Sequence, residues 1–207
     1  NVDTVGLKTI NDPKYTDTSG NEQIHAGAHK LQYTNVGLRT DSGYEDGQNY
    51  ELYYTPADNN RSKVSSETVY LDGTINRRQI TKDSFKVYDR TTHAEKPAQK
   101  VYDGTTEFNP TNVYLSSHAP AVGDTGIVSR DENHITFKLI GDKGYFTDNS
   151  GNRTKNVKEA TKLAYQVMGE SDAPNTYRLE DYYVLEGTTQ KDLNNTFDVT
   201  GAGKITP

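Results

Sequence analysis

The chain contains an internal repeat, and this feature limits its possible folds more than any other. Residues 15–21, Tyr-Thr-Asp-Thr-Ser-Gly-Asn, align with residues 146–152, Phe-Thr-Asp-Asn-Ser-Gly-Asn, and five of the seven positions are identical. Three further matches keep the same order along the chain: 30–33 with 162–165, 49–54 with 176–183, and 72–75 with 202–205. Four ordered matches predict that the 207 residues form two modules of one fold.

The ends of the matched blocks set the expected boundary between the modules. The blocks end at Ile75 in the first copy and at Ile205 in the second. The stretch between the modules has no glycine and several strand-forming residues, which predicts a rigid connection containing a strand. We therefore expect a first, partial module over 1–80 and a second over 81–207. The first lacks the segment that the second has at about 98–121.

Composition favours thin β-sheets over a large core. Only 31% of the residues are hydrophobic, whereas 15 are tyrosines, and the mean hydropathy is -0.91. Such a chain suits β-sandwiches, in which each strand has one dry and one wet face, better than a helical bundle. The absence of cysteine excludes disulfides, thiolate zinc sites and cysteine nucleophiles.

The net charge of -6 argues against nucleic acid and anionic membranes as partners held by long-range charge. No apolar run approaches the roughly 20 residues of a membrane-spanning helix. We therefore expect neither nucleic-acid binding nor membrane insertion in this segment.

Short runs of β-branched and aromatic residues predict strands at 68–71, 86–88, 113–116, 135–140, 162–168, 181–185 and 197–200. Turns are predicted at Asp46-Gly47, Asp72-Gly73, Asp103-Gly104, Gly123-Asp124, Gly141-Asp142 and Ser150-Gly151. A helix over 156–168 is an alternative, but its repeat counterpart 25–37 carries two glycines, so a strand is favoured. The expected fold is all-β, with two tandem immunoglobulin-like β-sandwich modules that form an elongated rod.

Residues 99–106, Gln-Lys-Val-Tyr-Asp-Gly-Thr-Thr, resemble the opening signature of the YDG and MBG repeats of large bacterial surface and exported proteins, including haemagglutinin-like adhesins. Residues 203–207, Gly-Lys-Ile-Thr-Pro, are similar to the closing strand of such repeats. The resemblance covers 98–207 directly and 1–75 through the internal repeat. It implies a non-enzymatic stalk segment of a bacterial cell-surface adhesin, located outside the cell, that projects a distal binding region. Its partners would be neighbouring repeat modules of the same parent chain.

The same signature has a purely structural explanation. Tyr-Asp-Gly-Thr at 102–105 predicts a β-turn in which Asp103 accepts hydrogen bonds from amides ahead of it and Gly104 supplies a positive φ. Tyrosines at 33, 50, 165 and 177 are expected to bury their rings and direct their hydroxyls to backbone or solvent. Exposed platforms that stack on a ligand are the alternative for these rings.

Two loops resemble part of a calcium site. Asp17, Ser19 and Asn21 place oxygens on alternate residues, as do the equivalent residues 148, 150 and 152. Calcium loops usually have an acid at the twelfth position, where only the second copy has one, Glu159. A solvated turn is therefore favoured, and calcium is the one cofactor that stays open.

The histidines do not predict a metal site. His25 and His29 are four residues apart, which suits a metal only on a helix, and Gly27 lies between them. His93, His118 and His134 lie near predicted turns without a clear ligand spacing. We expect surface or turn histidines at all five positions.

No motif predicts an enzyme. Nucleophile elbows and phosphate-binding glycine loops are absent, so no catalytic, cofactor-binding or metal-binding residue is assigned. An isopeptide cross-link between a lysine and an Asn or Asp side chain is a further alternative, although no residue spacing in this sequence indicates one. The alternative function is adhesive: the second module would bind a host-surface glycan or protein through its Tyr- and Asn-rich loops at 131–134 and 171–183.

Overall fold

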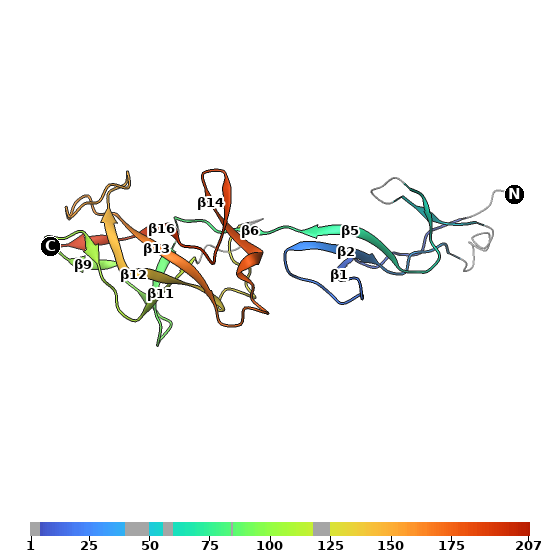
Figure 1. The fold of residues 1–207 in the computed structure, drawn as a ribbon, viewed down its shortest axis with the longest axis horizontal. Helices are drawn as coiled ribbons and strands as arrows, with labels where there is room; N and C mark the ends of the chain where they lie inside the picture. The colour runs from blue at the N-terminus through green and yellow to red at the C-terminus, as the bar shows by residue number, and fades with distance from the viewer. Residues whose placement is uncertain (1–4, 40–49, 56–59, 84, 118–124) are drawn as a thin grey trace. The chain divides into compact units, whose positions relative to one another are not determined.

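The chain folds as two compact units of β-strands. The structure is a computed structural model that describes residues 5–39, 50–55, 60–83, 85–117 and 125–207. The units, drawn in Figure 1, are unit 1 (Asn1–Asn76) and unit 2 (Arg77–Pro207). Within the described ranges the one helical element is a short 3-10 helix, η2 (Leu179–Asp181). The expected all-β fold class is confirmed.

The units divide between Asn76 and Arg77, a little before the boundary expected after residue 80. The reason is that β6 (Arg78–Gln79) pairs in parallel with β14 (Tyr182–Glu186) of unit 2. Ile80 follows directly and is buried in the core of unit 2. Residues 77–80 therefore belong to the second unit and not to the first.

Unit 1 is built on a three-stranded antiparallel sheet with the order β1-β2-β5. Its strands are β1 (Lys14–Thr16), β2 (Gly27–Tyr33) and β5 (Val69–Ile75). A short antiparallel hairpin of β3 (Tyr53–Tyr54) and β4 (Ser62–Lys63) lies between β2 and β5 in the chain.

Unit 2 is built on a larger sheet with the order β16-β13-β12-β11-β7-β8, in which β10 also pairs with β12. Its strands are β7 (Phe85–Asp89), β8 (Glu95–Lys96), β10 (Glu107–Phe108), β11 (Val113–Ser117), β12 (Ile135–Thr147), β13 (Lys162–Ser171) and β16 (Phe197–Ala202). A hairpin joins β14 to β15 (Thr189–Asp192). The last strand, β17 (Lys204–Thr206), pairs in parallel with β9 (Gln99–Val101).

The large sheet curls until two of its strands that are not hydrogen-bonded neighbours meet. The backbone of β16 at Gly201 lies against β7, since a Cβ added at Gly201 would come within 2.0 Å of the Phe85 carbonyl oxygen. Next to it, the Thr200 N–H donates to the Lys82 carbonyl at 2.7 Å. Glycine is required at position 201 because any side chain would occupy the space of that carbonyl.

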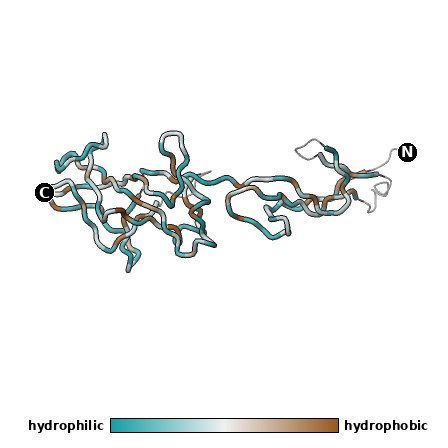
Figure 2. Tube along the Cα trace, viewed as in Figure 1, coloured by the Kyte–Doolittle hydropathy of each residue, from teal (hydrophilic) through white to brown (hydrophobic). Residues whose placement is uncertain are grey.

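The core of unit 2 lies inside this curl. Along β13, Leu163, Tyr165 and Val167 are buried, whereas Gln166 between them is exposed, which is the alternation expected of a strand with one dry face. The rings of Phe137 and Phe85 make an edge-to-face contact in this core, with their centroids 5.0 Å apart. Figure 2 shows hydrophobic and hydrophilic positions interspersed along the strands of this unit.

All seven predicted strands are present, but two predicted turns are wrong. Asp72-Gly73 lies inside β5, where the ring of Tyr15 would be 2.8 Å from a Cβ at Gly73, so this glycine serves packing. Gly141-Asp142 lies within β12, at a register shift where Gly141 has a φ of 72°. It forms a bulge in a continuing strand. The pairs Asp46-Gly47 and Gly123-Asp124 lie outside the described residues.

The alternative helix over 156–168 is also absent. The Asn156 carbonyl accepts hydrogen bonds from the amides of Glu159 and Ala160, which makes a single turn, and β13 begins two residues later at Lys162. Local helix-forming residues here are overridden by the sheet, as the repeat comparison predicted.

The two units contain the same three-stranded arrangement. Tyr15 pairs with Leu31 in unit 1, and Phe146 pairs with Leu163 in unit 2. The third strand follows the same registers, with Leu31 opposite Leu71 and Leu163 opposite Gly201. In both units a hairpin, β3–β4 or β14–β15, separates the second strand from the third. These are the positions that the sequence alignment pairs.

The aspartate loops after the first strand of each arrangement also match. The Asp17 Oδ1 accepts the N–H groups of Ser19 (2.8 Å) and Asn21 (2.9 Å), and the Asp148 Oδ1 accepts those of the equivalent residues 150 and 152, each at 2.9 Å. Gly20 and Gly151 follow with φ of 86° and 87°. The serine-glycine turn predicted at 150–151 is confirmed.

Gly201→Ala tests the contact between β16 and β7. The added methyl group collides with the Phe85 carbonyl, so we expect the free energy of unfolding of unit 2 to fall by about 1–3 kcal/mol in scanning calorimetry. Ala202→Ser, on the exposed side of the same strand, should stay within about 0.5 kcal/mol of the wild type. Equal stability of both variants would mean that the strands do not touch.

Candidate functional site

The two loops proposed for ligand recognition come together in unit 2. The ring of His134 stacks on that of Tyr177, with centroids 3.8 Å apart and planes 4° from parallel. The His134 Nδ1 lies 2.9 Å from the Asp172 Oδ2, and the Asp172 N–H donates to the His134 carbonyl at 3.2 Å. The loops at 131–134 and 171–183 therefore form one surface, which we call the loop cluster: Arg130, His134, Asp172 and Tyr177.

A buried carboxylate anchors the loop cluster. Asp131 is 1% exposed and accepts a hydrogen bond from the Tyr182 hydroxyl at 2.8 Å and one from the Arg130 Nε at 2.7 Å. The Val128 N–H donates to the same hydroxyl at 3.2 Å. Burial, followed by the bond to Asp131, raises the pKa of Tyr182 well above its usual value. The tyrosine therefore stays a donor, and the carboxylate stays paired.

The loop cluster is suited to recognition by stacking and charge. The Arg130 guanidinium lies 5.9 Å from the centroid of the Tyr177 ring, so a cation, an aromatic pair and the Asp172 carboxylate adjoin one another. A serine, Ser171, is also near, but its hydroxyl donates to the Tyr177 carbonyl at 2.6 Å. It is held by the backbone and not by His134, so the geometry is not that of an activated nucleophile.

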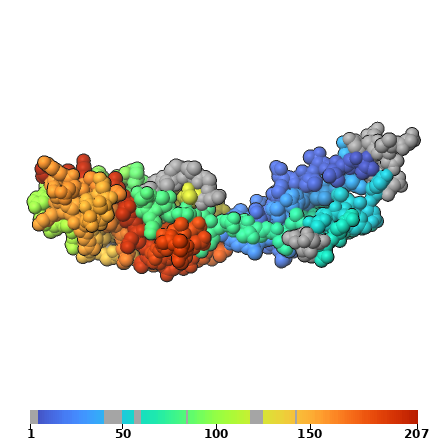
Figure 3. Space-filling view, turned by 90° about the horizontal axis from the view of Figure 1, so that it is seen from above, coloured from blue at the N-terminus to red at the C-terminus, as the bar shows by residue number. Residues whose placement is uncertain are grey.

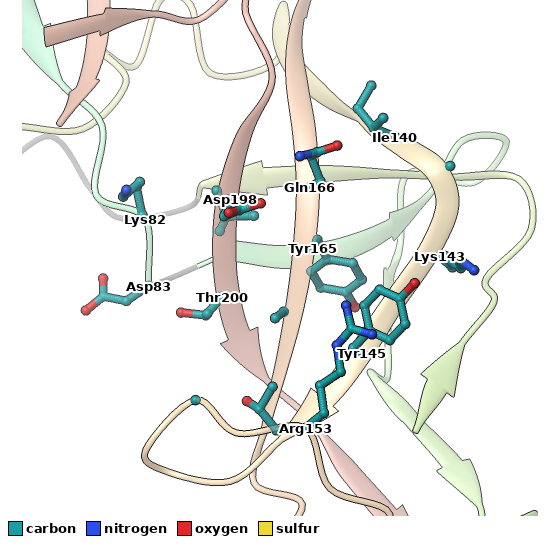
Figure 4. Close-up of a pocket in the computed structure, with 15 residues that line it drawn as sticks. Lys82, Asp83, Ile140, Lys143, Tyr145, Arg153, Tyr165, Gln166, Asp198 and Thr200 are labelled. Carbon is teal, nitrogen blue, oxygen red and sulfur yellow. The ribbon is translucent and has the colours of Figure 1, made fainter. Parts of the chain in front are cut away.

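A second polar surface lies on the outer face of β12, β13 and β16. There a hollow of about 710 Å³ is lined by the residues labelled in Figure 4, including Tyr145, Arg153, Gln166, Asp198 and Thr200. The Arg153 guanidinium carbon lies 3.5 Å from the centroid of the Tyr145 ring, an arrangement that Figure 4 shows. This is a broad face for polar contacts of both charge signs.

The hollow gathers further cations. The Lys143 Nζ lies 5.6 Å from the centroid of the Tyr145 ring and 3.4 Å from the Glu107 Oε1. Hydrogen bonding with Tyr145 and then Glu107 raises the pKa of Lys143. Across the hollow, Lys82 and Asp83 lie on the segment that leads to β7 (Figure 4).

The aspartates of the two calcium-like loops act as hydrogen-bond acceptors within their own loops. The carboxylates of Asp17 and Asp148 accept backbone and side-chain N–H groups of their own loops, and the bonds to Asn21 and Asn152 lower the pKa of each. In the described part of the chain, no three His, Asp or Glu side chains gather in a group that could hold a metal ion. The loops are hydrogen-bonded turns.

His25 and His29 lie close together, but they are not on a helix. His29 is on strand β2, with its Nε2 2.7 Å from the His25 carbonyl oxygen, so the spacing of four is not on a helix. His93 lies at a turn with a φ of 56°. His118 lies outside the described residues.

The predicted turn at Tyr-Asp-Gly-Thr is confirmed. The Asp103 Oδ1 accepts the Thr105 N–H at 2.9 Å, and Gly104 has a φ of 82°. The Lys100 Nζ donates to the same oxygen at 2.6 Å and to the Thr105 carbonyl at 2.9 Å. These bonds, that from Lys100 first, hold the pKa of Asp103 far below its usual value.

The tyrosines named from the sequence differ in exposure. Tyr165 is buried, and its burial raises its pKa far above the usual value, but its hydroxyl has no hydrogen-bond partner. Tyr33 and Tyr177 are half-buried, whereas Tyr50 is exposed. The sequence did not indicate the Asp131–Tyr182 and Tyr145–Arg153 pairs, because no local pattern links residues that only the sheet brings together.

Comparison of the chain with protein-family models, with curated proteins and with solved structures finds no significant match. Among the described residues, none of the helical structure is long and apolar enough to cross a bilayer.

Tyr182→Phe tests the anchor of the loop cluster. Removing the hydroxyl leaves one oxygen of the buried Asp131 without its donor, so we expect a loss of about 1–3 kcal/mol in the free energy of unfolding. Tyr183→Phe, at the next position of β14, should change it by less than about 0.5 kcal/mol. Denaturant titration of both variants measures this, and equal effects would show that the Asp131 bond contributes nothing.

Proposed function

We propose that this chain is a non-enzymatic stalk segment of a bacterial cell-surface adhesin, placed outside the cell, that carries load and projects a distal binding region. Its two units would be tandem immunoglobulin-like β-sandwich modules whose partners are neighbouring repeat modules of the parent chain. The observation that carries this proposal is how the first strand and the last strand of unit 2 are each held. Both terminal strands are paired in parallel with internal strands.

This pairing suits a unit that is pulled through its ends. The first strand, β6, and the last, β17, lie at opposite ends of unit 2 in Figure 1. Tension applied through the two ends would reach the parallel pairs of β6 with β14 and of β17 with β9 first. We expect the interstrand hydrogen bonds of these two pairs to resist that tension.

Side chains and backbone fix both terminal strands. At the last strand, β17, the Lys204 N–H donates to the Ala98 carbonyl at 3.1 Å, and the Tyr102 N–H donates to the Thr206 carbonyl at 2.8 Å. Ile205, between them, is 2% exposed and anchors β17 in the core.

Two arginines fix the first strand of unit 2, β6. The Arg77 guanidinium donates to the Tyr182 carbonyl and to the Asp192 carboxylate, each at 2.6 Å. Arg78 donates to the Thr125 and Gly126 carbonyls at 2.8 and 3.2 Å. Arginine suits this role because its several donors lie in a fixed plane.

The repeated arrangement supports the proposal further. A stalk is built by repeating one module, and the two units share a three-stranded sheet and a loop with the same hydrogen bonds. The Tyr-Asp-Gly turn begins directly after β9, the strand that holds β17. The segment that resembles the repeat family thus lies where the load would be borne.

Tyr102→Pro tests the load-bearing pair. Proline removes the N–H that donates to Thr206, while the exposed Tyr102 ring is lost equally in the control Tyr102→Ala. In single-molecule pulling from both ends of the chain, we expect unit 2 to unfold at a lower force in the proline variant than in the alanine variant. At equilibrium the backbone bond contributes only about 1 kcal/mol. Equal unfolding forces would refute a load-bearing role for this pair.

A second function, adhesion by unit 2 itself, is favoured by the loop cluster. The stacked His134 and Tyr177 rings beside Arg130 and Asp172 resemble the aromatic and charged composition of binding surfaces. The ligand would be a host-surface glycan or protein. Figure 3 shows that the neighbouring hairpin of β14 and β15, in red, is on the surface of unit 2.

Tyr177→Ala tests adhesion. We expect the substitution to abolish binding of the chain to host cells or to a glycan array, because it removes the ring that stacks on His134. Tyr102→Ala, which removes an exposed ring elsewhere in unit 2, is the control and should leave binding unchanged. Binding that survives Tyr177→Ala would exclude the loop cluster.

A further inference from the structure

The sheet of unit 1 has one apolar face. Residues directly opposite each other on antiparallel strands point to the same side, so Tyr15, Leu31 and Leu71 share a face with the alternate residues of their strands. We call this the inner face of unit 1; it consists of Tyr15, His29, Leu31, Tyr33, Val69, Leu71 and Ile75. The opposite face is polar and includes the ion pair of Lys30 with Asp72.

The inner face is covered less completely than its counterpart in unit 2. Five of the equivalent side chains of unit 2 are at most 3% exposed, and they are Phe146, Leu163, Tyr165, Val199 and Ile205. The counterpart of His29, Thr161, is exposed. On the inner face of unit 1, Val69 is the one buried residue, at 8%, and the other six are half-buried. The same sheet therefore has a dry face in one unit and a half-wet face in the other.

The structure shows what covers the face in unit 2. The Phe108 ring makes an edge contact with Phe146, with centroids 5.8 Å apart, and the Lys100 Nζ lies 5.7 Å from the same ring. The Phe85 carbonyl touches the backbone at Gly201. These residues all lie within 85–117, the segment that runs from β7 to β11 and precedes the shared sheet in the chain.

Unit 1 does not supply an equivalent cover from its described residues. Its sheet comprises β1, β2 and β5 alone, and the β3–β4 hairpin is a separate two-stranded sheet. The remaining residues of unit 1, at 1–4, 40–49 and 56–59, contain few apolar side chains: Val2, Tyr44, Pro56 and Ala57. Strand β7 cannot also cover the inner face of unit 1, because its residues Phe85 and Val87 are each 2% exposed in the core of unit 2.

We propose that the inner face of unit 1 binds a pair of β-strands with alternating large apolar residues, of the kind that β7 and β11 form in unit 2. Leu71 stands where unit 2 has Gly201, so the bound strands cannot touch the sheet backbone as β7 does. They lie a side chain's height above it, at the roughly 10 Å spacing of packed sheets. This inference goes beyond the stalk function and does not depend on it.

The test uses the whole chain and a synthetic peptide of residues 85–117 as the probe. Fluorescence anisotropy of the labelled peptide measures binding to the wild type, to Leu31→Lys and to Gln32→Lys. Leu31 lies on the inner face, and Gln32 lies next to it on the opposite face, so the variants add the same charge on two sides of one strand. We expect saturable binding by the wild type, a loss of at least about tenfold in Leu31→Lys, and less than about twofold change in Gln32→Lys.

Hydrogen exchange locates the bound peptide and guards against misfolding. Backbone amides of β2 and β5 should gain protection when the peptide is added to the wild type or to Gln32→Lys. Protection confined to unit 2 would show that the peptide replaces its own copy there, and would overturn the proposal. So would the absence of binding at about 1 mM, or an equal loss in both variants. Self-association of the chain that Leu31→Lys abolishes, without binding of the peptide, would show instead that a second copy covers the face.

Discussion

Burial of one face of a three-stranded sheet is the constraint on which unit 2 depends. The inner residues of β12, β13 and β16 become dry only because the sheet curls and brings β7 against β16, with Gly201 in contact with the Phe85 carbonyl. Burial of large apolar side chains is the main favourable contribution in so polar a chain, at roughly 25 cal/mol per Å² of apolar surface. The loop cluster has its own anchor, the hydrogen bond between Tyr182 and Asp131.

Unit 1 shows what the same sheet is like without closure. Its strand registers follow those of unit 2, yet most of its inner face stays half-buried. Hydrogen bonds between strands therefore define the sheet, and a second layer is needed to dry it. The stability of unit 1 should depend more strongly than that of unit 2 on whatever contacts this face.

The sequence predicted the strands and the Asp103 turn, because these depend on local alternation and on residues that are close in the chain. It could not predict the contacts between distant segments. Asp72-Gly73 has the composition of a turn, but its glycine lies under the Tyr15 ring inside a strand. Nothing in the sequence around Gly201 shows why a glycine is needed there. The reason is its contact with the Phe85 carbonyl in the curled sheet. The Asp131–Tyr182 bond joins residues 51 positions apart, so no spacing rule could find it.

The pairing of β17 with β9 has a consequence for biosynthesis. Thr206 and Lys100, which are joined by a hydrogen bond, are separated by 106 positions, so β9 has to wait for almost the whole of unit 2 to leave the ribosome. The sheet of unit 1 needs only residues up to Ile75 and can form earlier. During translation the two units should thus fold in order, and unit 2 should expose its apolar strands for longer, which makes it the stage at which chaperones are most needed.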